Sequence, residues 1–375
     1  MKKFNYILTL SVLAINLNLP LFAQNEGFSA VNPRVVTGGT LRDGKQIALT
    51  KSTSPKQFLQ SPLTTDEVEA ASWAKQISSN KSNLAVVMVE RGKIIYQSYN
   101  TPSNENSPLL SMSMSKTLTA QVIGQMHCAG LIPTLDAKAK TYSTLLEGTI
   151  YGEASVRNLL TMSSGVATPS AAGELRPNAW RDITTGAYAL KDYVRDYGTN
   201  DAGATQAKSG GRFVYSNTDT VSLSFVADGR GGFLNNFSKL IWEKVKTEAD
   251  GYWLVDKDQS AVSYAGFSAT ARDWARLALF GLDQLKNGES CIRKFMHEST
   301  APQIANNGPT GKAFASYGYQ TWVGNFGPRS SYWYVGYGGQ RIGIDPEKER
   351  IIVVFSSKED YMQDVYKIFS RWQRH

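Results

Sequence analysis

A serine and a lysine three positions apart, Ser113 and Lys116, have the types and spacing of a nucleophile and its base. Residues three apart on a helix share one face, so the hydroxyl and the amine can meet if this segment is helical. A serine hydroxyl is a weak nucleophile until a base removes its proton. A lysine can act as that base when burial lowers its pKa from about 10.4 towards neutrality.

The sequence around Ser113 predicts a helix with one buried side. Apolar residues recur at helical spacing from about Met112 to Ala129, and Gly130 closes the segment. A helix N-terminus also favours a negative charge that develops during a reaction. The Ser-x-x-Lys pattern alone is weak, because Ser78 and Lys81 repeat it elsewhere. The alternative interpretation of Ser113 and Lys116 is a helix cap and a solvated lysine.

A second candidate pair is Tyr215 and Asn217, which follow a Gly-Gly-Arg-Phe-Val segment. A tyrosine beside a Ser–Lys pair can relay a proton to a leaving group, although its ordinary pKa of about 10 requires a nearby ammonium group. An asparagine two residues further on can donate to a substrate carbonyl. The alternative is a tyrosine buried in the core on a strand or loop.

A third candidate is the strand-like segment from Tyr334 to Gln340, which holds three glycines within four residues. Glycines weaken a strand unless something must come close to its backbone. An edge strand whose N–H faces the nucleophile would supply half of an oxyanion hole. The alternative, a tight hairpin turn at Gly338-Gly339, is compatible with that function.

Together the three motifs resemble those of the penicillin-recognising serine hydrolases, a family of class C β-lactamases, DD-peptidases, family VIII esterases and 6-aminohexanoate-dimer hydrolases. The resemblance covers roughly residues 70–375. Four further segments are similar to family segments, the last two most of all to the aminohexanoate branch: Leu159–Val166, Gly266–Arg276, Tyr317–Trp322 and Gly339–Pro346.

The resemblance implies a role for each candidate. Catalysis would rest on Ser113, Lys116 and Tyr215, and the backbone N–H groups of Ser113 and Tyr337 would form the oxyanion hole. The substrate would be bound by Asn217, Tyr334 and Gly336. No metal or organic cofactor is needed for this chemistry.

The third motif departs from the family pattern. β-Lactamases and DD-peptidases typically carry Lys-Thr-Gly or His-Thr-Gly there, whereas the best register places Tyr334, Val335 and Gly336 at these positions. The cation that would face a penicillin carboxylate is then missing. We therefore expect an amidase or esterase that resembles the 6-aminohexanoate-dimer hydrolases and carboxylesterases. Two alternatives are a β-lactamase or DD-peptidase acting on β-lactams or cell-wall peptides, and a non-catalytic peptide-binding homologue.

Composition excludes several other classes. The 375 residues include two cysteines and three histidines, too few for a disulfide-rich scaffold or a cysteine-rich zinc module. The net charge is +8, but the basic residues are scattered, so nucleic-acid binding is not indicated. The expected partner is a small amide or ester substrate, and the oligomeric state stays open. Export would permit a disulfide, but the sequence cannot pair Cys128 with Cys291, which are 163 residues apart, and we prefer to interpret them as two free buried thiols.

The N-terminus has the layout of a secretory signal peptide. Lys2 and Lys3 are followed by a largely apolar run to Phe22, and Ala23 precedes a polar segment. Asn16, Asn18 and Pro20 interrupt the run, which makes a permanent membrane span unfavourable. We therefore expect cleavage after residues 1–23 and export, to the periplasm or out of the cell.

The remaining sequence predicts an α/β (α+β) fold, and the resemblance implies that it is of the β-lactamase/transpeptidase-like type. Segment 24–70 is interpreted as an extended lead-in to a hydrolase domain over 71–375. Strand-like segments at about 71–110 and 290–375 would build one antiparallel sheet flanked by helices, and a mainly helical part would be inserted at about 135–290.

Overall fold

We analysed a computed structural model of the chain. It describes residues 30–31, 34–37, 40–43, 45–167, 169–170, 175–199, 208–324, 326–328 and 330–375. The signal peptide expected at residues 1–23 lies outside this part of the chain.

An antiparallel sheet of eight strands forms the larger layer, and both ends of the described chain contribute to it. Strands β5 (Asn83–Glu90) and β6 (Lys93–Tyr99) form a hairpin, and β5 pairs with β15. The order is β10-β11-β12-β13-β14-β15-β5-β6. The other strands are β10 (Ile304–Ala305), β11 (Ser316–Tyr317), β12 (Trp322–Gly324), β13 (Ser331–Gly336), β14 (Gln340–Asp345) and β15 (Arg350–Ser356).

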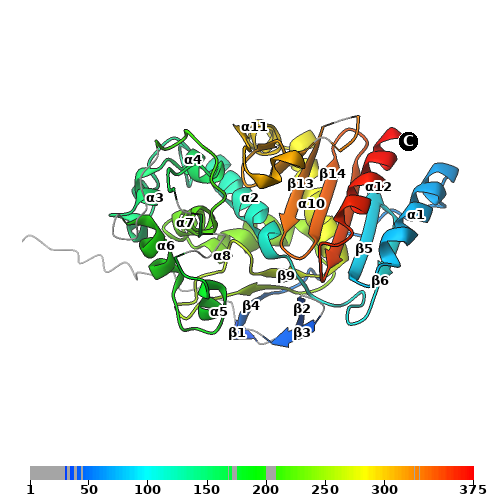
Figure 1. The fold of residues 1–375 in the computed structure, drawn as a ribbon, viewed down its shortest axis with the longest axis horizontal. Coiled ribbons are helices and arrows are strands. Elements are labelled where there is room, and N and C mark those ends of the chain that lie inside the picture. Colours follow the sequence, from blue (N-terminus) through cyan, green and yellow to red (C-terminus); the bar gives the residue numbers. More distant parts are fainter. Residues whose placement is uncertain are drawn as a thin grey trace, which may run out of the picture.

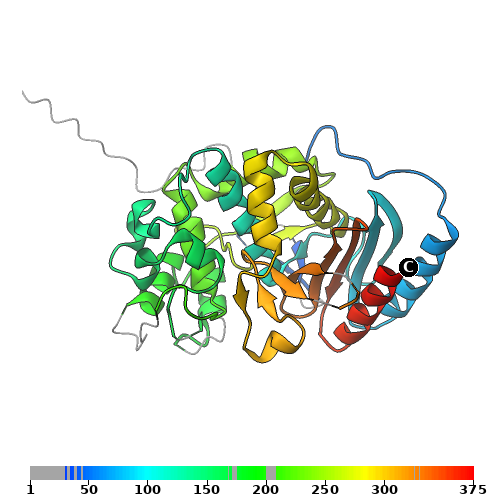
Figure 2. The same cartoon turned by 90° about the horizontal axis from the view of Figure 1, so that it is seen from above.

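Helices cover both faces of this sheet. On one face α1 (Thr65–Ser78) and α12 (Met362–Arg374) lie side by side (Figures 1 and 2). The opposite face packs against α10 (Ala271–Asn287). Because both faces are covered, β5 is buried along its whole length, as its continuous apolar run predicts. The expected sheet from both chain ends is confirmed.

The predicted helical part lies beside the sheet, to the left in Figure 1. Helix α2 (Ser115–Cys128) runs along the junction, where it packs against α7 (Asn217–Asp228) and α11 (Ser290–Thr300). The remaining α-helices of the described chain are α3 (Ile150–Glu153), α4 (Val156–Leu160), α5 (Ala179–Thr184), α6 (Leu190–Gly198), α8 (Phe233–Phe237) and α9 (Glu243–Val245).

A second sheet, which the sequence analysis missed, lies beneath the junction. It has the order β1-β4-β8-β9-β7-β2-β3. Its strands have only two to four residues, too short for a clear alternation of apolar and polar residues. They are β1 (Ala30–Val31), β2 (Arg34–Thr37), β3 (Thr40–Asp43), β4 (Gln46–Leu49), β7 (Leu109–Leu110), β8 (Gly251–Leu254) and β9 (Phe267–Ala269). Part of the expected lead-in therefore belongs to a sheet.

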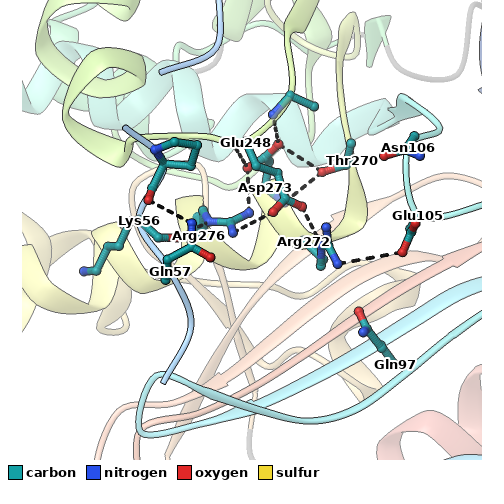
Figure 3. Close-up of polar contacts among 12 residues, drawn as sticks. Lys56, Gln57, Gln97, Glu105, Asn106, Glu248, Thr270, Arg272, Asp273 and Arg276 are labelled. Atoms are coloured by element: carbon teal, nitrogen blue, oxygen red, sulfur yellow. Dashed lines mark hydrogen bonds and ion pairs between the residues drawn. The ribbon is translucent and has the colours of Figure 1, made fainter. Parts of the chain in front are cut away.

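A buried ionic network fastens the lead-in to α10 (Figure 3). Arg276 lies between Glu248 and Asp273, with N···O distances of 2.8 and 2.9 Å, and its side chain is 2% exposed. Its Nε donates to the carbonyl oxygen of Lys56 at 2.9 Å. Arg272, one turn earlier on the same helix, also pairs with Glu248. The network therefore connects three parts of the chain: the lead-in at Lys56, Glu248 shortly before β8, and helix α10.

The interpretation of the two cysteines as free thiols is wrong. Cys128, the last residue of α2, forms a disulfide with Cys291 in the first turn of α11. Helices α2 and α11 pack against each other, which brings the two Cα atoms to 5.7 Å despite a separation of 163 residues. Sequence spacing alone could not show that the two helices are neighbours.

Candidate active site

Ser113 lies at the start of the central helix, in the 3₁₀ turn Met112–Met114 that continues into α2. The side chain of Lys116 returns over this turn, so that its Nζ is 3.0 Å from Ser113 Oγ. Met112, directly before the nucleophile, has φ +49°, a conformation that is unfavourable for a residue with a side chain. Backbone strain of this kind persists where surrounding structure fixes it, often at functional sites.

Lys116 is fully buried, and the loss of hydration lowers the pKa of its ammonium group well below the usual value. Its Nζ has two further partners, Asn217 Oδ1 at 2.8 Å and the carbonyl oxygen of Tyr264 at 3.1 Å. Both are acceptors. A neutral amine can donate one N–H to each of them, which leaves its lone pair for the Ser113 hydroxyl proton. The geometry is therefore that of a general base.

Tyr215 completes the cluster from the loop that leads into α7. Ser216 caps this helix by accepting the N–H of Asp219, which fixes the direction of the chain at Tyr215. Lys116 Nζ lies 5.0 Å from the centre of the Tyr215 ring. Burial raises the pKa of Tyr215 above its usual range, although a hydrogen bond with Ser113 and the charge of Arg341 act in the opposite direction. Tyr215 is thus a neutral phenol near pH 7, able to pass on a proton.

Strand β13 approaches the nucleophile at Gly336. A Cβ atom there would lie 2.3 Å from the carbonyl oxygen of Ser111 and 3.2 Å from Cβ of Met112. Only glycine allows the strand to come this close to the turn that carries Ser113. Ser113, Gly336 and Tyr337 line one pocket, as an oxyanion hole between Ser113 and Tyr337 requires.

The expected substrate contact of Tyr334 is wrong. Alternate residues of a strand share one face, and the face of β13 that carries Tyr334 is covered by α2. Its side chain is buried, and its hydroxyl accepts a hydrogen bond from Gln121 of that helix at 3.0 Å. The register of the motif holds at Gly336, but the Tyr334 side chain points into the core.

The pocket at this site has a volume of about 1020 Å³, and several aromatic side chains line it. Asn217 lines it beside the Ser–Lys pair. The sequence motifs missed most of the wall: Trp180, Tyr193, Phe213, Tyr264 and Trp322. They also missed the charged lining residues Arg176, Arg212, Arg341 and Glu359. These residues come from helices, loops and strands far from Ser113 along the chain, so no local pattern connects them with it.

The second Ser-x-x-Lys pattern is structural. The Ser78 hydroxyl, at the end of α1, is 2.6 Å from that of Tyr96, and neither Ser78 nor Lys81 lines the pocket. Within the described ranges we find no cluster of histidine, cysteine and acidic side chains that could hold a metal ion. Among the helices of the same residues, none is both long and apolar enough to cross a bilayer.

Comparisons with known proteins agree with this geometry. The family model described as Beta-lactamase matches residues 66–372. The 6-aminohexanoate-dimer hydrolase of Paenarthrobacter ureafaciens is 24% identical over 298 residues, which cover 74% of this chain and 73% of that protein. A solved structure from Bacillus anthracis, provisionally named a 6-aminohexanoate-dimer hydrolase, has a TM-score of 0.72 at 22% identity and covers 88% of this chain and 90% of its own.

Two further solved structures share the fold at lower identity. The penicillin-binding protein of Bacillus halodurans has a TM-score of 0.61 at 18% identity, over 81% of this chain and 98% of its own. EstCE1, a hydrolase with promiscuous acyltransferase activity, has a TM-score of 0.61 at 12% identity, over 81% of this chain and 96% of its own. The extent of the family match is decisive: this chain belongs to the β-lactamase family and is a serine hydrolase of the amidase and esterase type.

Proposed function

We propose that the chain hydrolyses amide or ester bonds of small linear molecules through an acyl-enzyme on Ser113. The observation that carries this proposal is the environment of Lys116. Its Nζ has two acceptors for its N–H groups and the Ser113 hydroxyl as its third neighbour. Burial lowers the pKa of its ammonium group and thereby favours the neutral form that a base requires.

The first half of the reaction forms the acyl-enzyme. Lys116 takes the proton of Ser113 as Oγ bonds to the substrate carbonyl carbon. The resulting oxyanion accepts hydrogen bonds from the backbone N–H groups of Ser113 and Tyr337. The bond to the leaving group then breaks. Tyr215 gives its proton to the departing amine or alcohol and is reprotonated by Lys116. In the second half, water loses a proton to the same groups and attacks the ester carbonyl, which releases the acid and restores Ser113.

The pocket and the relatives support the proposed substrate class. Several aromatic and other apolar side chains line the pocket, which suits an acyl chain of several methylene groups. The curated relative is named for a dimer of 6-aminohexanoate, a linear amide with such chains. We therefore place linear amides and short-chain esters before β-lactams as substrates.

Intact-mass analysis after treatment with a fluorophosphonate tests the acyl-enzyme directly. We expect one adduct on the wild-type protein and none on Ser113→Ala, with turnover of p-nitrophenyl butyrate lost in parallel. Ser78→Ala is the matched control, because Ser78 belongs to the other Ser-x-x-Lys pattern, and it should label and turn over like the wild type. An unlabelled wild-type protein would favour a non-catalytic peptide-binding homologue instead.

We also propose that the enzyme is exported and that its mature form begins near Gln24. The basic start, the apolar run and Ala23 support this. So does the disulfide between Cys128 and Cys291, since such bonds persist mainly in oxidising compartments. N-terminal sequencing of the protein from a fractionated host is the test. Protein that starts at Met1 and stays in the cytoplasm would contradict the proposal.

A further inference from the structure

Arg341 is a buried cation at the edge of the active-site pocket. It lies on β14, directly opposite Val335 of β13, and its side chain is 6% exposed. Three of its five N–H groups donate to protein acceptors: Nε to Tyr366 Oη at 3.0 Å, and Nη1 to the carbonyl oxygens of Gly336 and Gln340 at 2.6 and 2.9 Å. Its Nη2 lies 3.4 Å from Glu359 Oε1.

The hydrogen bond from Arg341 to Gly336 is the shortest of the three, and the position of its acceptor in the backbone matters. The carbonyl of Gly336 and the N–H of Tyr337 belong to the same peptide unit. This bond is trans, since the cis bond of the described chain is Thr101–Pro102. In a trans peptide the C=O and the N–H point in opposite directions. Arg341 therefore holds the peptide from the side opposite to its N–H, the donor expected at the oxyanion.

The turn between β13 and β14, residues 337–339, is also held by hydrogen bonds to the peptides that follow. Gln340 Nε2 donates to the carbonyl oxygen of Tyr337 at 3.0 Å, and the N–H of Gly338 donates to Glu359 Oε1 at 3.2 Å. Glycines at 338 and 339 have φ of +80° and +93°, so the turn itself offers little stiffness. The side chains around it must provide the rigidity that an oxyanion hole requires.

We infer that Arg341 is a positioning residue of the oxyanion hole, which orients the Gly336–Tyr337 peptide and strengthens its N–H as a donor. A cation on the carbonyl oxygen polarises the amide, and hydrogen bonds in series reinforce one another. A donor fixed before the reaction costs no reorganisation when negative charge develops. The inference rests on the proposed acyl transfer at Ser113. It concerns a residue to which the sequence analysis assigned no role.

The test compares Arg341→Met and Arg341→Lys with the control Arg350→Lys. Arg350, on the next strand, is equally buried and also binds a carboxylate, Glu90 at 3.0 Å, and a carbonyl oxygen, that of Trp372, but it does not line the pocket. Removal of an entire oxyanion donor costs on the order of 10²–10³ in kcat. We expect kcat to fall about 10- to 100-fold in Arg341→Met and by less in Arg341→Lys, with KM nearly unchanged. Arg350→Lys should lower thermal stability and leave kcat unchanged.

A second measurement separates positioning from a loss of structure. A trifluoromethyl ketone analogue of the substrate forms an oxyanion on Ser113, so its affinity should fall in proportion to kcat/KM across the Arg341 variants. Arg341→Met with wild-type kcat and analogue affinity would overturn the inference. If Arg341→Met does not fold, Arg341→Lys decides in the same way. An inactive wild-type protein would refute the proposed function instead, which keeps the two failures distinct.

Discussion

Asn217 Oδ1 lies 2.8 Å from Lys116 Nζ, which joins the first residue of α7 to the first turn of α2 across 101 positions of the chain. The contact explains why the Ser-x-x-Lys and Tyr-x-Asn motifs act together. The amide oxygen accepts one N–H of the amine, and the carbonyl of Tyr264 accepts another. Neither partner carries a negative charge, so this set of contacts gives the ammonium form no ion pair to set against the cost of burial.

The first prediction concerns the pH dependence of activity. Because burial lowers the pKa of Lys116, we expect the neutral amine to persist to lower pH than in an exposed lysine and to be lost on acidification through that pKa. We expect kcat/KM to fall about tenfold per pH unit below it, as one proton adds to the base. A pH–rate profile for p-nitrophenyl butyrate measures this. Activity that appears only near pH 10 would contradict it.

The second prediction concerns stability and the same residue. In the unfolded chain Lys116 holds its proton up to about pH 10.4, whereas the folded chain releases it at lower pH. Between these two pKa values the unfolded state binds more protons, so stability rises with pH by up to about 1.4 kcal/mol per unit. Lys116→Met should lack this slope and all activity. Urea unfolding at several pH values compares the two, and parallel profiles would refute the assignment.

More of the candidate active site than of the fold could be predicted from the sequence. Ser113, Lys116 and Tyr215, which the structure brings together, could be proposed as candidates because each motif fixes residue types at short spacing. The large sheet could be predicted from its apolar strands. The second sheet could not, because its strands are too short to show a period. The disulfide of Cys128 needed the packing of α2 on α11, which no local pattern contains.

The error at Tyr334 has a similar origin. A motif gives the position of a strand, but the direction of a side chain depends on what covers each face. Helix α2 covers the face of Tyr334, and Gln121 binds its hydroxyl there. Arg341, from the neighbouring strand, brings positive charge to the pocket edge instead. Cross-strand neighbours of this kind follow from register, which the sequence does not specify.

The third prediction tests the approach of β13 to the nucleophile. A Cβ atom at Gly336 would lie 2.3 Å from the Ser111 carbonyl oxygen, so Gly336→Ala should push the strand away and widen the oxyanion hole. We expect kcat/KM to fall by about 100-fold or more. Gly343→Ala is the control, because its Cβ would lie 2.5 Å from the Trp333 ring in the core. That variant should be less stable yet retain the activity of the folded enzyme. Equal activity in both variants would contradict the prediction.

The fourth prediction concerns the disulfide. A cross-link over 163 residues restricts the unfolded chain and should stabilise the fold by about 5 kcal/mol on the chain-entropy model. For a protein of this size that corresponds to a Tm decrease of roughly 6 °C when both cysteines are replaced by serine. Differential scanning calorimetry of the oxidised wild type and the double variant measures the change. A mass increase of two alkyl groups without prior reduction would show that the thiols are free.

The last prediction concerns substrate preference. Enzymes specialised for β-lactams usually place a lysine or histidine beside the third motif, where it reads the ring carboxylate. Here the corresponding side chain, Tyr334, points into the core. A candidate cation on the neighbouring strand, Arg341, directs three of its N–H groups at Tyr366 and two backbone carbonyls and lies 3.4 Å from Glu359, which leaves it poorly placed for a carboxylate.

We therefore expect kcat/KM for p-nitrophenyl butyrate and for a 6-aminohexanoate dimer to exceed that for nitrocefin. Slow nitrocefin turnover is compatible with this expectation, since the same serine would attack any carbonyl that reaches the oxyanion hole. Ser113→Ala should remove all three activities, which shows that they share one site. A nitrocefin value tenfold above both others corresponds to about 1.4 kcal/mol of extra transition-state binding. That result would identify a β-lactamase, because a ring carboxylate would then have found a partner that the arrangement around Arg341 does not offer.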